Sequence, residues 1–318
     1  MKKLMRFFKP YVGFAILAPL FKMFEAILEL FVPLVMTGII DEGIEHSDKN
    51  YIWTHGLILV GLGAAGLVMS LTAQFFAART AVGFSKDLKS SLFRHIQTLD
   101  FSDLDKVGNA TLINRMTADA DKLQTGINMT LRLFLRSPFI VFGAAVMAYT
   151  VDHRSALFFV IAIPILAAIV FGIMLGTVPL YSKVQKALDK SLLTAGENLS
   201  GIRVIRAFNM QKKEEARFEE ETENYAKGAI FSSKISSLLN PITFIIVNAA
   251  LIAILYNGAV EVDENILTKG ELIAVVNYMS QILVELIKLA DLIILMTKSL
   301  ASANRISEVF EIGDSRRV

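Results

Sequence analysis

The chain has 318 residues, of which 54% are hydrophobic and 19% are charged, and its formal net charge is only +2. Such a small net charge argues against a nucleic-acid partner. The absence of cysteine excludes disulfides and thiolate metal sites. The mean hydropathy of +0.53 is too high for a soluble domain of this length and predicts several membrane-crossing helices.

The N-terminal segment MKKLMRFFKP interleaves basic and apolar side chains. It has no small-residue cleavage site after a short apolar core, so we expect it to be retained rather than removed as a signal peptide. The pattern predicts a short helix lying in the membrane interface before Pro10 turns the chain inward. A simple basic cytoplasmic tail is the alternative.

Six apolar runs predict an all-α membrane protein with six transmembrane helices. The hydrocarbon core of a bilayer is about 30 Å thick and requires roughly 20 helical residues. The expected spans are about 11–40, 52–78, 133–151, 155–182, 235–258 and 270–298. The third reaches this length only if its helix begins before Ser137, with Arg132 and Arg136 extending toward the membrane surface.

Two spans carry charged residues at helical spacing. The first has Lys22, Glu25 and Glu29 on one face, and the sixth has Glu285, Lys288 and Asp291. A charge that faces lipid costs several kcal/mol, so both faces should look into protein or water. They could line a transport cavity for cationic or zwitterionic amphiphiles, in which Glu25 and Glu29 select for positive charge. Alternatively, Lys22 pairs with Glu25 and Lys288 with Glu285 as structural ion pairs, and Asp291 lies at the wet cytoplasmic edge.

Two amides on the sixth span complete the candidate cavity. Asn277 and Gln281 are one turn apart and point the same way as Glu285. In a membrane such amides either contact substrate or form interhelical hydrogen bonds. The candidate substrate-cavity residues are therefore Lys22, Glu25, Glu29, Asn277, Gln281, Glu285 and Lys288.

Most of the positive charge lies in two long connections, the first arm (79–132) and the second arm (183–234). Nine Lys and Arg residues fall in 79–136 and ten in 183–234, whereas the other connections are mainly acidic. The positive-inside rule therefore places both arms and both termini in the cytoplasm, with the spans in the inner (plasma) membrane.

Each arm is expected to be helical, because an unstructured loop of this length is unusual. Apolar residues recur at helical spacing, and turn residues occur near Asp100–Gly108 and, in the second arm, near Phe208–Lys213. We therefore expect two helices per arm, joined by a turn. About 25 helical residues at 1.5 Å each would project roughly 35–40 Å beyond the membrane, far enough to meet a distant partner.

Several strings, in order along nearly the whole chain, resemble one family. FSDLDKVGNATLINRMTADAD (Phe101–Asp121) and ENLSGIRVIRAFNMQKKEEARFEEE (Glu197–Glu221) resemble the first and second intracellular loops of ABC exporter half-transporters of the bacterial multidrug or lipid type. LTKGELIAVVNYMSQI and SLASANRISEVFE resemble the sixth helix of that family and its exit. The positions that match in the two loops are Gly108, Leu112, Arg115, Asp119, Gly201, Ile202, Ile205, Phe208 and Phe218.

The resemblance implies that residues 1–310 form an exporter transmembrane domain and that 311–318 begin a linker to a nucleotide-binding domain missing from this chain. That domain would bind ATP and Mg²⁺, so the chain itself would be neither an enzyme nor a cofactor-binding protein. It also implies that the turns of the arms dock on this domain. The implied coupling residues are Phe101, Asp103, Leu104 and Asp105 in the first arm, and Phe208, Asn209, Met210 and Gln211 in the second.

The chain departs from the family pattern in three respects. Gln211 stands where the family commonly has an acidic residue, and the sixth helix has no proline near Leu286. No GxxxxGK[ST] loop for phosphate is present, and Leu199-Ser200-Gly201 resembles the nucleotide signature only superficially, because it lies between transmembrane spans.

The four histidines have no metal-ligand spacing, and no catalytic arrangement is identified.

The function expected from this resemblance is export of a hydrophobic or amphiphilic compound by alternating access. Six spans enclose too little for such a cavity, so a second half-transporter, identical or different, is expected as a partner. The substrate could be a drug, a lipid or a peptide. An ion-coupled secondary transporter and a non-transporting membrane scaffold are the alternatives; the first is disfavoured by the long arms and the second by charges at mid-bilayer depth.

Overall fold

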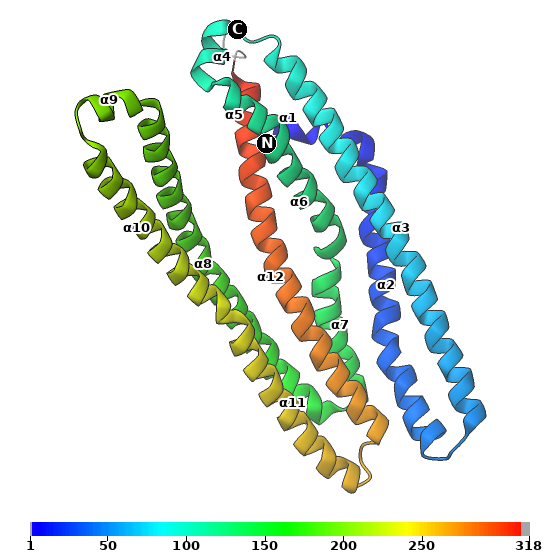
Figure 1. Ribbon diagram of the computed structural model, residues 1–318. Helices are drawn as coiled ribbons and strands as arrows, with labels where there is room; N and C mark the ends of the chain where they lie inside the picture. Colours follow the sequence, from blue (N-terminus) through cyan, green and yellow to red (C-terminus); the bar gives the residue numbers. More distant parts are fainter. Residues whose placement is uncertain (1, 313–318) are drawn as a thin grey trace. The chain divides into compact units, whose positions relative to one another are not determined.

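The computed structural model describes residues 2–312, and all regular structure in that range is helical (Figure 1). The α-helices are α1 (Lys2–Met5), α2 (Val12–Gly38), α3 (Lys49–Ile96), α4 (Phe101–Val107), α5 (Asn109–Asn114), α6 (Ala120–Leu133), α7 (Arg136–Val151), α8 (His153–Ser200), α9 (Ile202–Ala207), α10 (Gln211–Ser237), α11 (Leu239–Asp263) and α12 (Lys269–Glu311). The short 3₁₀ or π segments are η1 (Lys9–Tyr11), η2 (Ile39–Ile44) and η3 (Arg115–Asp119). The predicted all-helical fold is confirmed for these residues.

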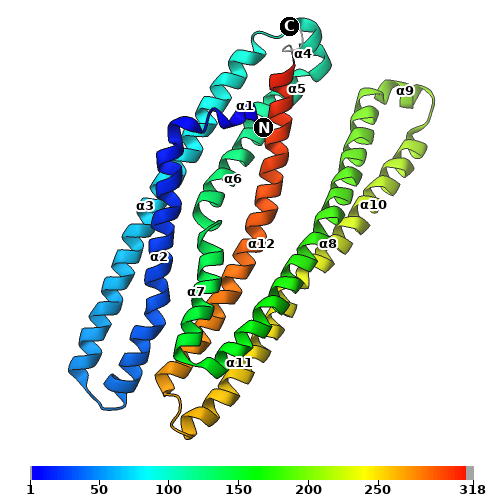
Figure 2. The same ribbon diagram turned by 180° about the vertical axis from the view of Figure 1, so that it is seen from behind.

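The chain divides into two compact units. Residues Pro164–Asn248 form one, which we call the hairpin unit, and the remaining described residues form the other, the bundle unit. In the bundle unit, α2 and α3 run side by side, and α12 packs against α2, α6 and α7 (Figures 1 and 2). The hairpin unit consists of the later part of α8, α9, α10 and the start of α11.

Five helical runs of the described chain are long and apolar enough to cross a membrane. They are Lys9–Ile44, Lys49–Ile96, Asn109–Val151, His153–Ser200 and Gln211–Asp263. The sixth expected span, within α12, is not one of these five. The helix α12 is nevertheless continuous from Lys269 to Glu311 and lies inside the bundle unit.

Side-chain hydrogen bonds define where the helices α3 and α12 begin. Asp48 is the N-cap of α3, and its carboxylate accepts hydrogen bonds from the backbone of Asn50 (2.9 Å) and Tyr51 (3.1 Å). At the start of α12, the side chain of Thr268 accepts from the backbone of Glu271, whose carboxylate accepts in return from the backbone of Thr268. With this reciprocal capping box, α12 begins directly after the connection that follows α11.

Gly270 brings α12 into backbone contact with α2. A Cβ atom at this position would lie 2.6 Å from the carbonyl oxygen of Thr37, so only glycine fits. The backbone N–H of Gly270 donates to Asp41 (2.8 Å), which also accepts from the hydroxyl of Thr268 (2.5 Å). Further along α12, the hydroxyl of Tyr278 donates to the carbonyl of Leu30 on α2 (2.8 Å). Close backbone packing and hydrogen bonds thus join α2 and α12 at several points along their length.

The first arm has a hydrophobic core of its own, which we call the first-arm core. Its buried residues come from α1, α3, α5, α6 and α12: Leu4, Phe84, Leu88, Leu92, Leu112, Ala120, Leu123, Ala303, Ile306, Val309 and Phe310. The chain reverses direction at α4, which ends at Gly108 with a positive φ of 80°. The core therefore joins both limbs of this arm to the last part of α12.

The N-terminal segment forms a short helix, as its sequence pattern predicted, and its position in the membrane interface stays a prediction. The helix α1 is a single turn, and Leu4 is buried in the first-arm core. The rings of Phe7 and Phe8 pack edge-on against Phe84. One face of this segment therefore packs against the first-arm core. The predicted linker start falls mostly on residues 313–318, which lie outside the described part of the chain.

Candidate functional site

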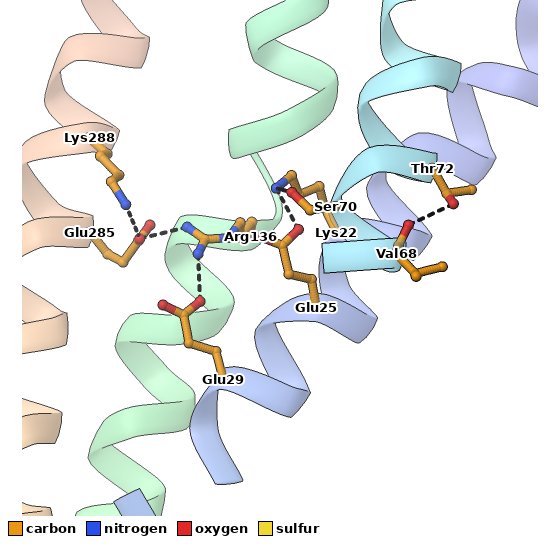
Figure 3. Close-up of polar contacts among 9 residues, drawn as sticks. All are labelled: Lys22, Glu25, Glu29, Val68, Ser70, Thr72, Arg136, Glu285 and Lys288. Atoms are coloured by element: carbon orange, nitrogen blue, oxygen red, sulfur yellow. Dashed lines mark hydrogen bonds and ion pairs between the residues drawn. The ribbon is translucent and has the colours of Figure 1, made fainter. Parts of the chain in front are cut away.

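Six charged side chains from three helices meet inside the bundle unit (Figure 3). The residues of this charged cluster are Lys22, Glu25 and Glu29 on α2, Arg136 on α7, and Glu285 and Lys288 on α12. Five of the six are candidate cavity residues from the sequence, and Arg136 is the addition. The cluster therefore brings together the charged faces that were predicted on the first and sixth spans.

Arg136 is the centre of this cluster. It is only 7% exposed, and its two terminal nitrogens donate to Glu285 and to Glu29, each at 2.6 Å. A guanidinium is suited to this position because its planar fork can serve two carboxylates at once. The prediction that Arg136 extends toward the membrane surface is therefore wrong. Its two acceptors, the buried Glu285 and the partly exposed Glu29, lie on neighbouring helices and hold the guanidinium inside the bundle.

Glu285 is 3% exposed and is the most heavily paired acid of the cluster. Besides Arg136, it accepts from the hydroxyl of Ser137 (2.7 Å) and from Lys288 one turn away (2.8 Å). Burial of a carboxylate is costly unless its oxygens are paired and hydrogen-bonded. Here both oxygens have partners, and these partners stabilise the charged carboxylate inside the bundle.

Lys22 and Glu25 form a second, local part of the cluster. The Lys22 ammonium donates to Glu25 at 2.5 Å and to the hydroxyl of Ser70 on α3 at 3.0 Å (Figure 3). The structure thus contains both ion pairs of the structural alternative, Lys22 with Glu25 and Lys288 with Glu285. Three cations face three anions, and the cluster has no surplus charge.

The remaining candidate cavity residues lie outside this set of contacts. Asn277 is exposed, and the side-chain oxygen of Gln281 is buried without a hydrogen-bond partner among the described residues. Asp291 is exposed, so it is not part of the buried cluster. Glu29 is the one carboxylate of the cluster with substantial access, because its side chain is 41% exposed. Among residues 2–312, no group of acids and histidines could hold a metal ion.

The expected coupling residues of the first arm divide into an outer and an inner pair. Phe101 is 87% exposed, and Asp105 is also exposed. Asp103 is buried, and Leu104 packs against the first-arm core. The short helix α4 therefore presents one aromatic side chain outward while its other face anchors it to the arm.

The turn of the second arm presents its residues differently. Phe208 is 73% exposed, and Asn209 is exposed with a positive φ of 56° that closes the turn between α9 and α10. Met210 is half-buried. Gln211 lines a groove of about 430 Å³ within the hairpin unit, together with residues such as Phe218. Apolar and polar side chains thus meet in this groove.

One interaction site was not identified as such from the sequence. Asp119 is 1% exposed and accepts hydrogen bonds from Arg305 on α12, from Arg115 (2.7 Å) and from Ser302 (3.0 Å). Burial raises the pKa of Asp119, but the hydrogen bonds from Arg305, Arg115 and Ser302 outweigh it and lower the pKa to about 2. The i, i+4 spacing of Arg115 and Asp119 was visible in the sequence, whereas the distant partner Arg305 was not.

His95 makes a second contact with the end of α12. Its Nε2 lies 3.0 Å from the carbonyl oxygen of Val309 and 3.1 Å from that of Ile312, both at the last turn of the helix. The last carbonyls of a helix lack intrahelical partners, so a side-chain donor here acts as a cap. Through His95 and Asp119, the end of α12 is fixed to the first arm.

Comparison with known proteins gives one family. The family described as ABC transporter transmembrane region matches residues 15–286. The chain is 29% identical over 317 residues to the ABC transporter ATP-binding protein YfiB of Bacillus subtilis, covering 99% of this chain and 55% of that protein. It is 26% identical over 301 residues to the ABC transporter ATP-binding protein Rv1273c of Mycobacterium tuberculosis, covering 95% and 52%.

A eukaryotic protein is also similar. ABC transporter B family member 1 of Dictyostelium discoideum is 21% identical over 314 residues, which cover 98% of this chain and 34% of that protein. The chain spans about half the length of the bacterial relatives named above. The matched family describes a transmembrane region, and both bacterial relatives carry an ATP-binding description in their names.

Proposed function

This chain belongs to the ABC transporter transmembrane region family, and from that premise we propose that it is the substrate-translocating part of an ATP-driven exporter. It works as a dimer with a second half-transporter, identical or different, by alternating access. ATP and Mg²⁺ are bound by a nucleotide-binding domain outside residues 1–318. The protein lies in the inner (plasma) membrane with both termini in the cytoplasm.

One observation carries the coupling to a motor domain: each arm ends in a short helix with an exposed aromatic ring. Phe101 and Phe208 are among the most exposed large hydrophobic residues of the chain. Large apolar side chains are costly to leave in water, and clusters of them mark interaction sites. Docking of both tips on nucleotide-binding domains would cover these rings and transmit motion along the helices to the membrane.

The charged cluster supports α12 as the sixth span. Charged residues within a membrane helix are tolerated when they face the bundle interior and are paired. Glu285 and Lys288 satisfy both conditions, because Glu285 faces Arg136 on α7 and Lys288 pairs with Glu285. We therefore place about residues 270–298 across the bilayer, as the final helix of a six-span domain.

The cluster also bears on the substrate, for which we propose a hydrophobic or amphiphilic compound. Because its three cations and three anions balance, the cluster presents no strong net field to a ligand. Glu25 is already engaged by Lys22, so Glu29 is the carboxylate that a cationic headgroup could approach. Drugs, lipids and hydrophobic peptides all fit this description.

Cysteine crosslinking tests the proposed coupling. The chain has no native cysteine, so single substitutions report without background. Ser102→Cys and Ala207→Cys place a thiol beside each exposed tip, and His46→Cys, between η2 and α3, is the matched control. We expect the two tip variants, and not the control, to crosslink to the nucleotide-binding domain in membranes. Failure of both tip variants to crosslink would disprove the coupling.

Transport in inverted membrane vesicles tests the energy source and the substrate. Uptake should require ATP and persist when ion gradients are dissipated; uptake driven by an ion gradient alone would instead establish the secondary-transporter alternative. Glu29→Gln should reduce uptake of a cationic dye relative to a neutral analogue, with Glu25→Gln as the comparison. Equal effects on both dyes would show that Glu29 does not sense charge.

A further inference from the structure

An apolar cavity of about 550 Å³ lies in the bundle unit beside the N-terminal segment. Its walls come from the N-terminal segment, α3, α6 and α12, which converge near α1 in Figure 1. The lining includes Met5, Phe8, Ile127, Phe134, Met296 and Leu300. This volume falls in the range of about 300–1,000 Å³ typical of sites for small organic ligands. The charged cluster contributes no residue to it.

The cavity is an extension of the first-arm core. Leu4, Phe84, Leu123 and Ala303 belong to both, so the same packed side chains that hold the arm together form one wall. At Gly126, α6 touches α12 so closely that a Cβ atom would lie 2.1 Å from the hydroxyl oxygen of Ser299. Close packing of this kind holds α6 and α12 together along this wall of the cavity.

The lining offers very few polar groups. Among the described residues that line it, the only polar side-chain groups are the hydroxyls of Thr130, Thr297 and Ser299. A ligand rich in hydrogen-bonding groups would lose its partners in water without regaining them here. The part of a ligand that enters this cavity must therefore be a hydrocarbon chain or a similar apolar group.

The segment that forms one wall also carries positive charge. Arg6 and Lys9 flank the lining residue Phe8, are exposed, and have no acidic ion-pair partner among the described residues. The guanidinium of Arg6 lies 4.7 Å from the ring centre of Phe7, an arrangement that positions its charge without neutralising it. No Asp or Glu occurs in residues 1–24 of the sequence. An anionic headgroup therefore complements this segment.

The position of the cavity along the helices also suits a ligand that comes from the membrane. It extends from Phe134 and Ile293, inside the third and sixth proposed spans, to Ala303, beyond the sixth. A ligand there would have its chain at membrane depth and its head near the cytoplasmic surface. Basic segments adjacent to a membrane helix attract the anionic lipids of that leaflet.

We propose that this cavity binds one anionic phospholipid of the membrane, with an acyl chain inside and the phosphate at Arg6 and Lys9. The lipid joins the N-terminal segment to α6 and α12. It is a resident ligand rather than cargo. The proposal rests on the membrane topology proposed above but not on transport, and its test measures retained lipid rather than export.

Native mass spectrometry of the assembled transporter tests this proposal. The assembly is reconstituted in nanodiscs with equal amounts of phosphatidylglycerol and phosphatidylcholine of identical chains, then extracted into detergent. We expect about one phosphatidylglycerol to be retained per chain. Thr297→Trp fills the cavity and should abolish retention, whereas Leu295→Trp, on the same helix but outside the lining, should preserve it. Arg6→Gln/Lys9→Gln should lower retention roughly tenfold or more.

Each result decides the proposal. Equal retention of the two lipids, or undiminished retention in Thr297→Trp, overturns it. If Thr297→Trp fails to assemble, the exposed-surface double variant Arg6→Gln/Lys9→Gln decides alone: a loss of phosphatidylglycerol supports the site, and unchanged retention overturns it. Transport plays no part in any of these measurements.

Discussion

The two arms are built from similar lengths of helix, yet they are stabilised in different ways. The first arm has a hydrophobic core to which α12 and the N-terminal segment contribute, and it contains the buried carboxylate of Asp119. The second arm is a helical hairpin with many exposed large apolar side chains, such as Leu192, Leu193 and Leu199. Its best-paired acid, Glu221, accepts from Thr194 at 2.5 Å and lies near Lys190 and Arg217, both substantially exposed.

Within its own unit, the first arm therefore buries its apolar side chains more completely than the second arm does. The first arm buries its apolar face on other parts of the same unit, so its packing does not require a partner. Apolar faces left exposed over several turns mark sites of association. If the protein forms the dimer proposed above, we expect the partner chain to cover these faces. Substitutions at matched positions of the two regions test this contrast.

The largest expected effect comes from Arg136→Gln in the bundle unit. It leaves Glu285 buried and Glu29 without its cation, and breaking a buried pair costs about 3–5 kcal/mol. Arg217→Gln in the second arm should have a much smaller effect, because Arg217 is half-exposed and its ion pairs are long, at 3.5–3.6 Å. Chemical denaturation in detergent measures both.

A double variant controls for simple loss of side-chain volume. Arg136→Gln/Glu285→Gln removes one charge of each sign and restores the balance of the cluster, so it should recover part of the lost stability. If Arg136→Gln and Arg217→Gln destabilise equally, the contrast between the regions is wrong.

The next effect concerns apolar packing. Leu92 is 0% exposed in the first-arm core, so Leu92→Ala should destabilise the protein by about 3 kcal/mol through lost burial and a residual cavity. Leu193 in the second arm is 62% exposed in this chain, so Leu193→Ala should change stability by less than about 0.5 kcal/mol in a dissociated chain. In the assembled dimer, the cost at Leu193 should rise. A cost that stays small in the dimer would contradict the expected contact with a partner.

A smaller effect is expected from Asp119→Asn. Its partners Arg115 and Arg305 are partly exposed and can regain water, so we expect a loss of about 2 kcal/mol rather than the full cost of a buried pair. Hydrogen exchange should accelerate in α6 and in the last turns of α12, while α10 remains unchanged. Faster exchange confined to α10 would contradict the assignment of this contact to the first arm.

The smallest effect is the response to mild acid. The pKa of Asp119 is lowered from its usual 3.8 to about 2, so its stabilising contribution is complete only well above pH 3.8 and is lost as pH falls toward 2. Its loss on going from pH 5 to 4 is only about 0.3 kcal/mol. The hydrogen bond from Thr194 lowers the pKa of Glu221 below its usual 4.5, so that contribution also begins to fall below pH 4.5.

Limited pepsin digestion between pH 5 and 3 compares the two arms directly. Because the Glu221 contribution starts to fall at a higher pH than that of Asp119, cleavage should appear first in α10. Earlier cleavage in α6 would reverse the expected order of the two arms.

The sequence predicted the helical class because hydropathy and helical spacing are local properties. It also placed Lys22, Glu25, Glu285 and Lys288 on helix faces that must avoid lipid, and these side chains do meet inside the bundle unit. It could not predict that Arg136 lies between Glu29 and Glu285, because those partners are 107 and 149 residues away and helical spacing carries no information about such contacts.

Two other features depended on contacts between distant segments in the same way. The pattern around Leu4 predicted a helix in the membrane interface because it is amphipathic, and amphipathicity alone does not reveal that Leu4 packs in a protein core. The link between Asp119 and Arg305 was hidden because only Arg115 lies at local spacing.

The contact of Gly270 with Thr37 limits how the outer end of the bundle unit can move. Any motion that parts α2 from α12 there must break both hydrogen bonds to Asp41 and expose tightly apposed backbone to solvent. The helices α2 and α12 are therefore expected to move together at this end. In the transporter proposed above, a gate at this end would have to open between other helices.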